Sequence, residues 1–190
     1  DEADGFVSTY DETKYRAHVI AEERAAQGAP VVIVQPGSVY GPGDHALVGQ
    51  MIEQASTGKM PAKAFPELGL NMVHVDDVAD GIMLAYDKGQ VGESYVLGGE
   101  ITTQGDLIDR AAAIGGKKPP RMTVPPIVLK ALSPVSRWVG PMMDLPPNFR
   151  EMISAAHNVT YWAKDDKARR ELGYSPRDLD TGLRETIQAA

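Results

Sequence analysis

The first 45 residues alternate between a helical pattern and a short aliphatic run. Thr9 and Glu12 fit a capping box, so the sequence predicts a helix that starts there and ends before Gly28 and Pro30. The run "VVIVQPG" over residues 31–37 follows this helix. Its β-branched aliphatics predict a strand that is buried on both faces in a parallel sheet.

The rest of the chain repeats this alternation. Amphipathic and capped patterns predict helices over 47–57, 76–89 and 102–116, the last capped by Thr102 or Thr103, with a charged helix ending at Gly173 and a last helix from about Thr181. Short strands are expected at "NMVHV" and "GESYVLGG". Residues 117–147 are rich in proline and methionine and predict short helices that form a lid or wall over an apolar substrate pocket.

Helices that alternate with strands indicate an α/β fold. Only residues 31–35 have the pattern of a fully central strand, and one such strand cannot make a doubly wound sheet.

Composition narrows the function classes. The 190 residues carry a formal net charge of −7, which disfavours partners that are nucleic acids or anionic membranes. There is no cysteine, so disulfides, thiolate metal sites and a cysteine nucleophile are excluded, and the four scattered histidines predict no metal site. Because no apolar run approaches the roughly 20 residues that span a bilayer, we expect no membrane span and a cytoplasmic, soluble protein.

Tyr10 and Lys14 stand four residues apart, so both side chains leave the same face of the first predicted helix. An ammonium held near a phenol favours the phenolate, as a general acid/base for a hydroxyl or carbonyl substrate requires. The same spacing often arises by chance at a helix surface, so the pair alone does not decide between the two interpretations.

A glycine- and proline-rich loop further along the chain makes a catalytic role for the Tyr10–Lys14 pair more plausible. The loop "QPGSVYGPGD" follows the predicted strand, and such loops at the carboxyl ends of parallel strands are where α/β sheets bind ligands. Gly37, Gly41 and Gly43 let the backbone approach a ligand closely. Taken alone, the loop is equally compatible with a turn that leaves the sheet.

In order along the chain, five segments resemble the carboxyl-terminal part of extended short-chain dehydrogenases/reductases, the NAD-dependent epimerase/dehydratase and dihydroflavonol-reductase-like family. They are "DGFVSTYDETKYRAH", "VVIVQPGSVYGPGD", "MVHVDDVADGIMLAY", "GESYVLGGEITTQGDLID" and "KARRELGYSPRDLDTGLRETI". The resemblance implies the carboxyl-terminal part of a Rossmann-like doubly wound fold and a small α/β substrate-binding domain. Residues 1–45 would end the dinucleotide-binding domain. Residues 46–190 would be mainly substrate-binding, with segments that return to the Rossmann part.

The resemblance also implies an NAD(P)-dependent oxidoreductase that acts on a sugar nucleotide or another alcohol or ketone. Tyr10 would be the catalytic acid/base and would also contact the cofactor, and Lys14 would bind the nicotinamide ribose and support the tyrosine. Pro36, Gly37, Ser38 and Val39 would contact the nicotinamide carboxamide of NAD or NADP. Tyr40, Gly41 and Asp44 would edge the small-molecule substrate's pocket. His74, Tyr161, Trp162 and the Met142–Met143 pair are interpreted as structural or pocket-wall residues.

The family begins with a glycine-rich dinucleotide loop, and no such motif precedes Tyr10. About 100–150 residues of the family pattern are absent, so the sequence predicts a fragment that is inactive alone. Epimerase, dehydratase and reductase stay open, as does NAD against NADP. A non-catalytic dinucleotide-binding sensor or scaffold is the alternative function. The helix of Tyr10 and Lys14 is also a candidate homodimer interface, because relatives dimerise through it.

Overall fold

The computed structural model describes residue 6, residues 9–125 and residues 160–189. Its helices are α1 (Thr9–Ala26), α2 (Leu47–Thr57), α3 (Val75–Lys88), α4 (Gln104–Ile114), α8 (Asp166–Leu172) and α9 (Leu179–Gln188). Its strands are β1 (Ile33–Pro36), β2 (Ser38–Tyr40), β3 (Lys63–Ala64), β4 (Gly69–His74), β5 (Ser94–Leu97), β6 (Glu100–Thr103) and β7 (Thr123–Val124). The expected α/β architecture is confirmed. Most of the predicted lid and the Met142–Met143 pair lie outside the described residues.

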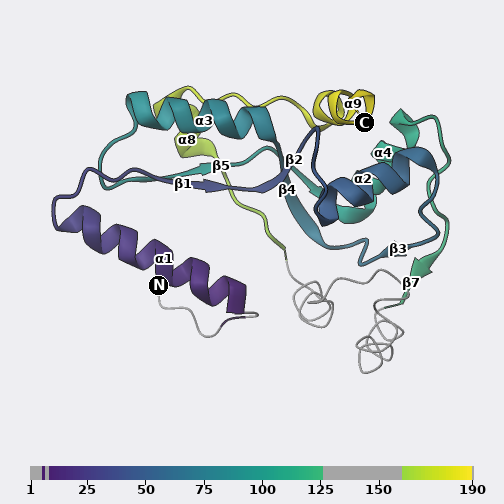
Figure 1. The fold of residues 1–190 in the computed structure, drawn as a ribbon, viewed down its shortest axis with the longest axis horizontal. Helices are drawn as coiled ribbons and strands as arrows, with labels where there is room; N and C mark the ends of the chain where they lie inside the picture. The colour runs from purple at the N-terminus through teal and green to yellow at the C-terminus, as the bar shows by residue number, and fades with distance from the viewer. Residues whose placement is uncertain (1–5, 7–8, 126–159, 190) are drawn as a thin grey trace.

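Parallel pairing dominates the strands. β1 pairs with β5 in parallel, and β2 pairs with β4 in parallel, while β6 joins the other edge of β4 in the antiparallel sense. In Figure 1, α3 and α8 lie on one side of the β1–β5 pair and α1 lies on the other. Helices α2, α4 and α9 gather at the opposite end of the molecule, around β4 and β2.

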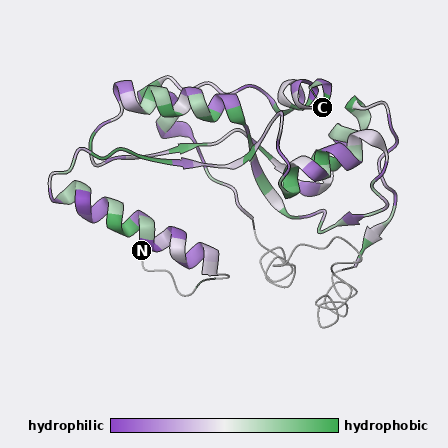
Figure 2. Ribbon diagram, in the orientation of Figure 1, coloured by the Kyte–Doolittle hydropathy of each residue, from purple (hydrophilic) through white to green (hydrophobic). Residues whose placement is uncertain are grey.

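Two apolar clusters follow this division. Helices α2, α4 and α9 turn apolar faces toward β2 and β4, around Ile52, Leu107 and Leu183. Helices α3 and α8 cover β5 with a second cluster that includes Leu97 and Leu172. In Figure 2 the apolar positions of α2, α3 and α4 alternate with polar ones, the pattern of helices that bury one face only.

The glycine stop of α1 is confirmed by its hydrogen bonds. Gly28 has φ 92°, and its amide bonds to Ala25 O at 2.9 Å, while the Ala29 amide bonds to Arg24 O at 3.0 Å. This is the Schellman arrangement, in which a residue without Cβ takes the left-handed conformation. Thr9, however, already lies inside the helix as its first residue, so its assignment as the cap is wrong.

The expectation that residues 31–35 form a strand buried on both faces is not met within this chain. β1 begins at Ile33 and its residues are half-buried or exposed, and among the described residues it pairs with β5 alone. The strand that is buried at every position is β4, flanked by β2 and β6. Its sequence includes Asn71 and His74, so it lacks the unbroken aliphatic pattern that signals a central strand.

The ends of several other helices lie at or close to the positions predicted from the sequence. Thr103 caps α4, its hydroxyl accepting the Asp106 amide at 3.2 Å. Helix α2 has the predicted bounds, and α8 ends at Gly173, which is left-handed with φ 75°. Helix α9 begins two residues before the expected Thr181, because Asp178 is its cap.

Candidate functional site

Tyr10 and Lys14 share one exposed face of α1. The Lys14 ammonium lies 5.4 Å from the centroid of the Tyr10 ring, and the Tyr10 side chain is 66% exposed. None of the helix's side chains is buried along its 18 residues. The helix alone therefore brings the pair together, and the Tyr10 hydroxyl is accessible to a ligand.

The loop that follows β1 is tied to the strands on both sides. The Gly37 amide donates to Leu97 O at 3.1 Å, which extends the β1–β5 ladder past Pro36. Ser38 then enters β2, where it pairs with Met72 of β4. Val39 is 38% exposed. The predicted cofactor residues thus form a rigid connection between two parallel strand pairs, with an apolar side chain on its open face.

Tyr40 lies in the interior. It is 2% exposed, its hydroxyl reaches Leu179 O at 3.5 Å, and its ring meets the His74 ring edge-on at a centroid distance of 5.5 Å. Burial, followed by the Asp77 carboxylate, raises the pKa of Tyr40 well above its ordinary value. Its phenol therefore stays protonated, and in this conformation its side chain offers a substrate no open surface.

Gly41 and Asp44 shape the turn beyond Tyr40. A Cβ at Gly41 would lie 2.5 Å from Val75 Cγ1, so only glycine allows the loop to pass this close to α3. The Asp44 carboxylate accepts the Ala46 amide at 2.8 Å, and the Asp44 amide donates to Gly41 O at 3.2 Å. The substrate contacts assigned to these residues stay predictions.

The first turn of α1, which carries Tyr10, lies toward the end of β1 from which the loop over residues 36–44 begins. In the view of Figure 1, the N-terminal end of α1 and the carboxyl end of β1 point to the same side. Near that end, Tyr161 has its pKa raised by burial and then by the Asp11 carboxylate, which places it within electrostatic reach of the first turn of α1. Among the described residues, no hydrogen bond or ion pair joins Tyr10 or Lys14 to residues 36–44.

His74 has the structural role that its sequence context favoured. It is 2% exposed and caps α3, its Nδ1 accepting the Asp76 amide at 3.3 Å. Accepting at Nδ1 places the proton of the neutral ring on Nε2. That nitrogen lies 4.0 Å from a Glu185 carboxylate oxygen.

An ion-pair cluster beside His74 was not foreseen from the sequence. The Arg177 Nε donates to both Asp77 carboxylate oxygens, at 3.1 and 3.0 Å, and its Nη1 donates to Glu185. The cluster joins the first turn of α3 to α9 across a hundred residues of chain. The doubled aspartate of "HVDD" was visible in the sequence, but the arginine that pairs with it had no signal of its own.

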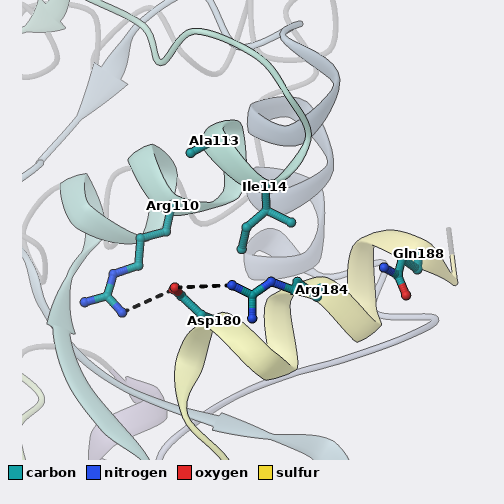
Figure 3. Close-up of a pocket in the computed structure, with 6 residues that line it drawn as sticks. All are labelled: Arg110, Ala113, Ile114, Asp180, Arg184 and Gln188. Carbon is teal, nitrogen blue, oxygen red and sulfur yellow. Dashed lines mark hydrogen bonds and ion pairs between the residues drawn. The ribbon is translucent and has the colours of Figure 1, made fainter.

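A groove of about 440 Å³ lies between α4 and α9, and none of the predicted site residues lines it. Figure 3 shows Asp180 between Arg110 and Arg184, with ion-pair distances of 3.4 and 3.8 Å. The other residues that line the groove are Ala113, Ile114 and Gln188. Arg110 also pairs with the carboxylates of Glu100 and Asp106, so both cations are already neutralised and the groove has no character of an anion site.

Residues 2–98 match the model of the NAD dependent epimerase/dehydratase family, which covers half of the chain. The chain belongs to this family. The resemblance found in the five sequence segments is thereby confirmed, and the α/β fold matches about half of the Rossmann-like fold of its structural neighbours.

Individual relatives agree with the family. The chain is 30% identical over 195 residues to a putative dihydroflavonol 4-reductase of Synechocystis sp., covering 95% of the chain and 54% of the relative. It is 30% identical over 184 residues to sterol demethylase protein B of Methylococcus capsulatus, covering 94% and 55%. The crystal structure of PA4631, a nucleoside-diphosphate-sugar epimerase from Pseudomonas aeruginosa, superimposes with a TM-score of 0.77 at 26% identity, covering 100% of this chain and 57% of that one.

The chain thus spans about half the length of the curated relatives it matches. In the part of the chain that the structure describes, no helix is both long and apolar enough to cross a membrane.

Proposed function

We propose that this chain is the carboxyl-terminal part of an NAD(P)-dependent epimerase, dehydratase or reductase, in which Tyr10 exchanges a proton with the substrate. The observation that carries the proposal is the exposed Tyr10–Lys14 pair, with the ammonium 5.4 Å from the phenol ring, in a chain of this family. Tyr40 offers the contrast, because burial keeps its phenol protonated and its hydroxyl lies against Leu179 O.

In the reductive direction, the Tyr10 hydroxyl donates its proton to the substrate's carbonyl oxygen as the carbonyl carbon gains a hydride. The carbonyl becomes an alcohol, and Tyr10 is left as a phenolate beside the Lys14 ammonium, which stabilises it electrostatically. In the oxidative direction the same phenolate takes the proton back. A bound NAD(P)(H) supplies or accepts the hydride.

The residues present fit one end of that cofactor. Val39 offers an apolar surface to a nicotinamide ring, and Lys14 offers an ammonium to ribose hydroxyls. A loop of this kind at the carboxyl end of a parallel strand is where dinucleotides bind in α/β sheets. Donors for the pyrophosphate would come from a glycine-rich upstream half, to which we assign the rest of the site.

The arrangement of the strands and helices supports a boundary between a dinucleotide-binding part, residues 1–45, and a mainly substrate-binding part, residues 46–190. Residues 1–45 carry α1, β1 and the loop, and β5 returns from the later part of the chain to pair with β1. Residues 46–190 would be mainly substrate-binding. Helix α1 buries none of its side chains, and among the described residues β1 uses one edge only, as expected if an upstream half packs against both.

The substrate is proposed as an alcohol or ketone, either on a sugar nucleotide or on a bulky apolar molecule. The similar proteins include a nucleoside-diphosphate-sugar epimerase and a sterol demethylase protein, so both classes stay open. The exposed aromatic side chains of Tyr161 and Trp162 favour the bulky class. A cytoplasmic location and a homodimer through α1 stay predictions from the sequence.

The alternative is a sensor or scaffold that binds the dinucleotide without turnover. A sensor has no need of an exposed phenol beside an ammonium, so the preserved pair favours the enzyme. The test is NAD(P)H oxidation by the complete protein against a panel of ketones and 4-keto sugar nucleotides. Steady oxidation with any of them supports the enzyme, whereas tight NAD(P)H binding with no oxidation across the panel supports the sensor.

A further inference from the structure

Asn71 is the most enclosed amide side chain near the proposed cofactor loop. It sits in the middle of β4 and is 1% exposed. Its Nδ2 donates to Ala163 O at 2.7 Å, and its Oδ1 accepts the Gly99 amide at 2.7 Å. A carboxamide this deeply buried is stable because both ends are bonded, so neither partner can move away without leaving a buried polar group unpaired.

Glycines pack directly against this residue. A Cβ at Gly37 would lie 2.5 Å from Asn71 O and 3.4 Å from its Cγ, and a Cβ at Gly98 would lie 2.7 Å from its Nδ2. No side chain fits at either position. Gly37 belongs to the loop that we assign to the nicotinamide, so the backbone of that loop packs first against the main-chain oxygen of Asn71 and then against its side-chain Cγ.

The hydrogen bond to Ala163 O ties Asn71 to the segment over residues 160–163. Thr160 bridges to Gly69 at the start of β4, and the Tyr161 amide donates to Gly69 O at 3.0 Å. This short segment lies within electrostatic reach of Asp11, the residue that follows Tyr10. Asn71 is therefore bonded on one side to the segment that pairs with Gly69 and packed on the other against the loop.

We propose that Asn71 is a positioning residue, which holds the Gly37 backbone against the nicotinamide end of the bound cofactor. The inference rests on the proposed function and deepens it. It places the effect of Asn71 at the nicotinamide end, because the rest of the dinucleotide would lie against the upstream half.

The test compares two ligands in the complete enzyme. NAD⁺ carries the nicotinamide and ADP-ribose lacks it, so the ratio of their dissociation constants isolates that end. Asn71→Asp keeps the acceptor for the Gly99 amide and replaces the donor to Ala163 O with a carboxylate oxygen. We expect NAD⁺ affinity to fall about tenfold, with ADP-ribose affinity changed by less than about twofold. Asn71→Ser, which is neutral, should give the same split.

Tyr174→Phe is the matched control. The Tyr174 hydroxyl donates to Gly98 O at 2.8 Å, so this variant removes a buried hydrogen bond from the same β5–β6 turn without touching the loop. It should lower the melting temperature while leaving the ratio of the two affinities unchanged.

The outcomes are distinguishable. Equal losses for NAD⁺ and ADP-ribose, no loss for either, or failure of both Asn71 variants to fold would make Asn71 merely structural and overturn the inference. A wild-type enzyme that binds neither ligand overturns the proposed function itself, and the inference with it.

Discussion

The ammonium of Lys14 lies 5.4 Å from the centroid of the Tyr10 ring, one turn further along α1. The pair needs no tertiary contact to form, since residues four apart on a helix meet on the same face. What the fold adds is access, because Tyr10 remains two-thirds exposed at the end of α1 that points to the same side as the proposed cofactor loop.

Replacing Lys14 tests the electrostatic half of the pair. Lys14→Met keeps a long side chain but removes the charge that stabilises the phenolate. We expect kcat/KM in the complete enzyme to fall about 100-fold. Arg16→Gln is the control, because Arg16 is exposed on the same helix and pairs only with Glu12 among the described residues. Equal activity of both variants would remove Lys14 from the mechanism.

Asp77 tests the cluster that joins α3 to α9. Asp77→Asn removes the charge that Arg177 pairs with, and the Asp77 side chain is only 9% exposed. We expect the free energy of unfolding to fall by about 2–3 kcal/mol, since Arg177 is left partly buried without its main partner. Asp80→Asn, at an exposed position of the same helix, should change it by less than about 0.5 kcal/mol. Denaturant titration measures both, and a silent Asp77→Asn would show that the cluster does not stabilise the fold.

Asp178 gives a pH-dependent prediction. The Thr181 amide donates to its carboxylate, and so does the Thr181 hydroxyl, which lowers the pKa of Asp178 below its ordinary value. A lowered carboxylate pKa adds stability that is present above the unfolded-state value and is lost as the pH falls through the folded-state value.

Asp178→Asn keeps a good cap without the charge. Wild type should therefore be more stable than this variant at pH 7, and the difference should shrink as the pH falls below about 4. Chemical denaturation of both proteins at pH 7 and pH 3 measures the difference. A difference that stays constant between the two pH values would contradict the assigned cause.

Local signals predicted the ends of the helices well. Gly28 and Gly173 stop α1 and α8 because a left-handed residue without Cβ satisfies the last carbonyls, and Thr103 caps α4 through its own hydroxyl. Such features depend on four or five neighbouring residues. They can therefore be read from the sequence without knowing the fold.

Burial could not be read in the same way. The aliphatic run of β1 has the pattern of a central strand, yet β4, with a polar Asn71 and His74, is the strand buried throughout. Asn71 is accommodated by partners 28 and 92 residues away, the Gly99 amide and Ala163 O. Likewise, Tyr40 stands in a loop-like sequence, but α9 covers it. Long-range contacts of this kind leave no local pattern.

The most direct measurement is turnover by Tyr10→Phe in the complete enzyme, beside Tyr15→Phe. Phenylalanine removes the proton donor and leaves the ring, and Tyr15 is a half-exposed tyrosine on the same helix that packs against Phe6. We predict that kcat of Tyr10→Phe falls by about 10²–10⁴-fold with the affinity for NAD(P)H preserved, while Tyr15→Phe retains wild-type turnover. Unchanged turnover in Tyr10→Phe would contradict the account.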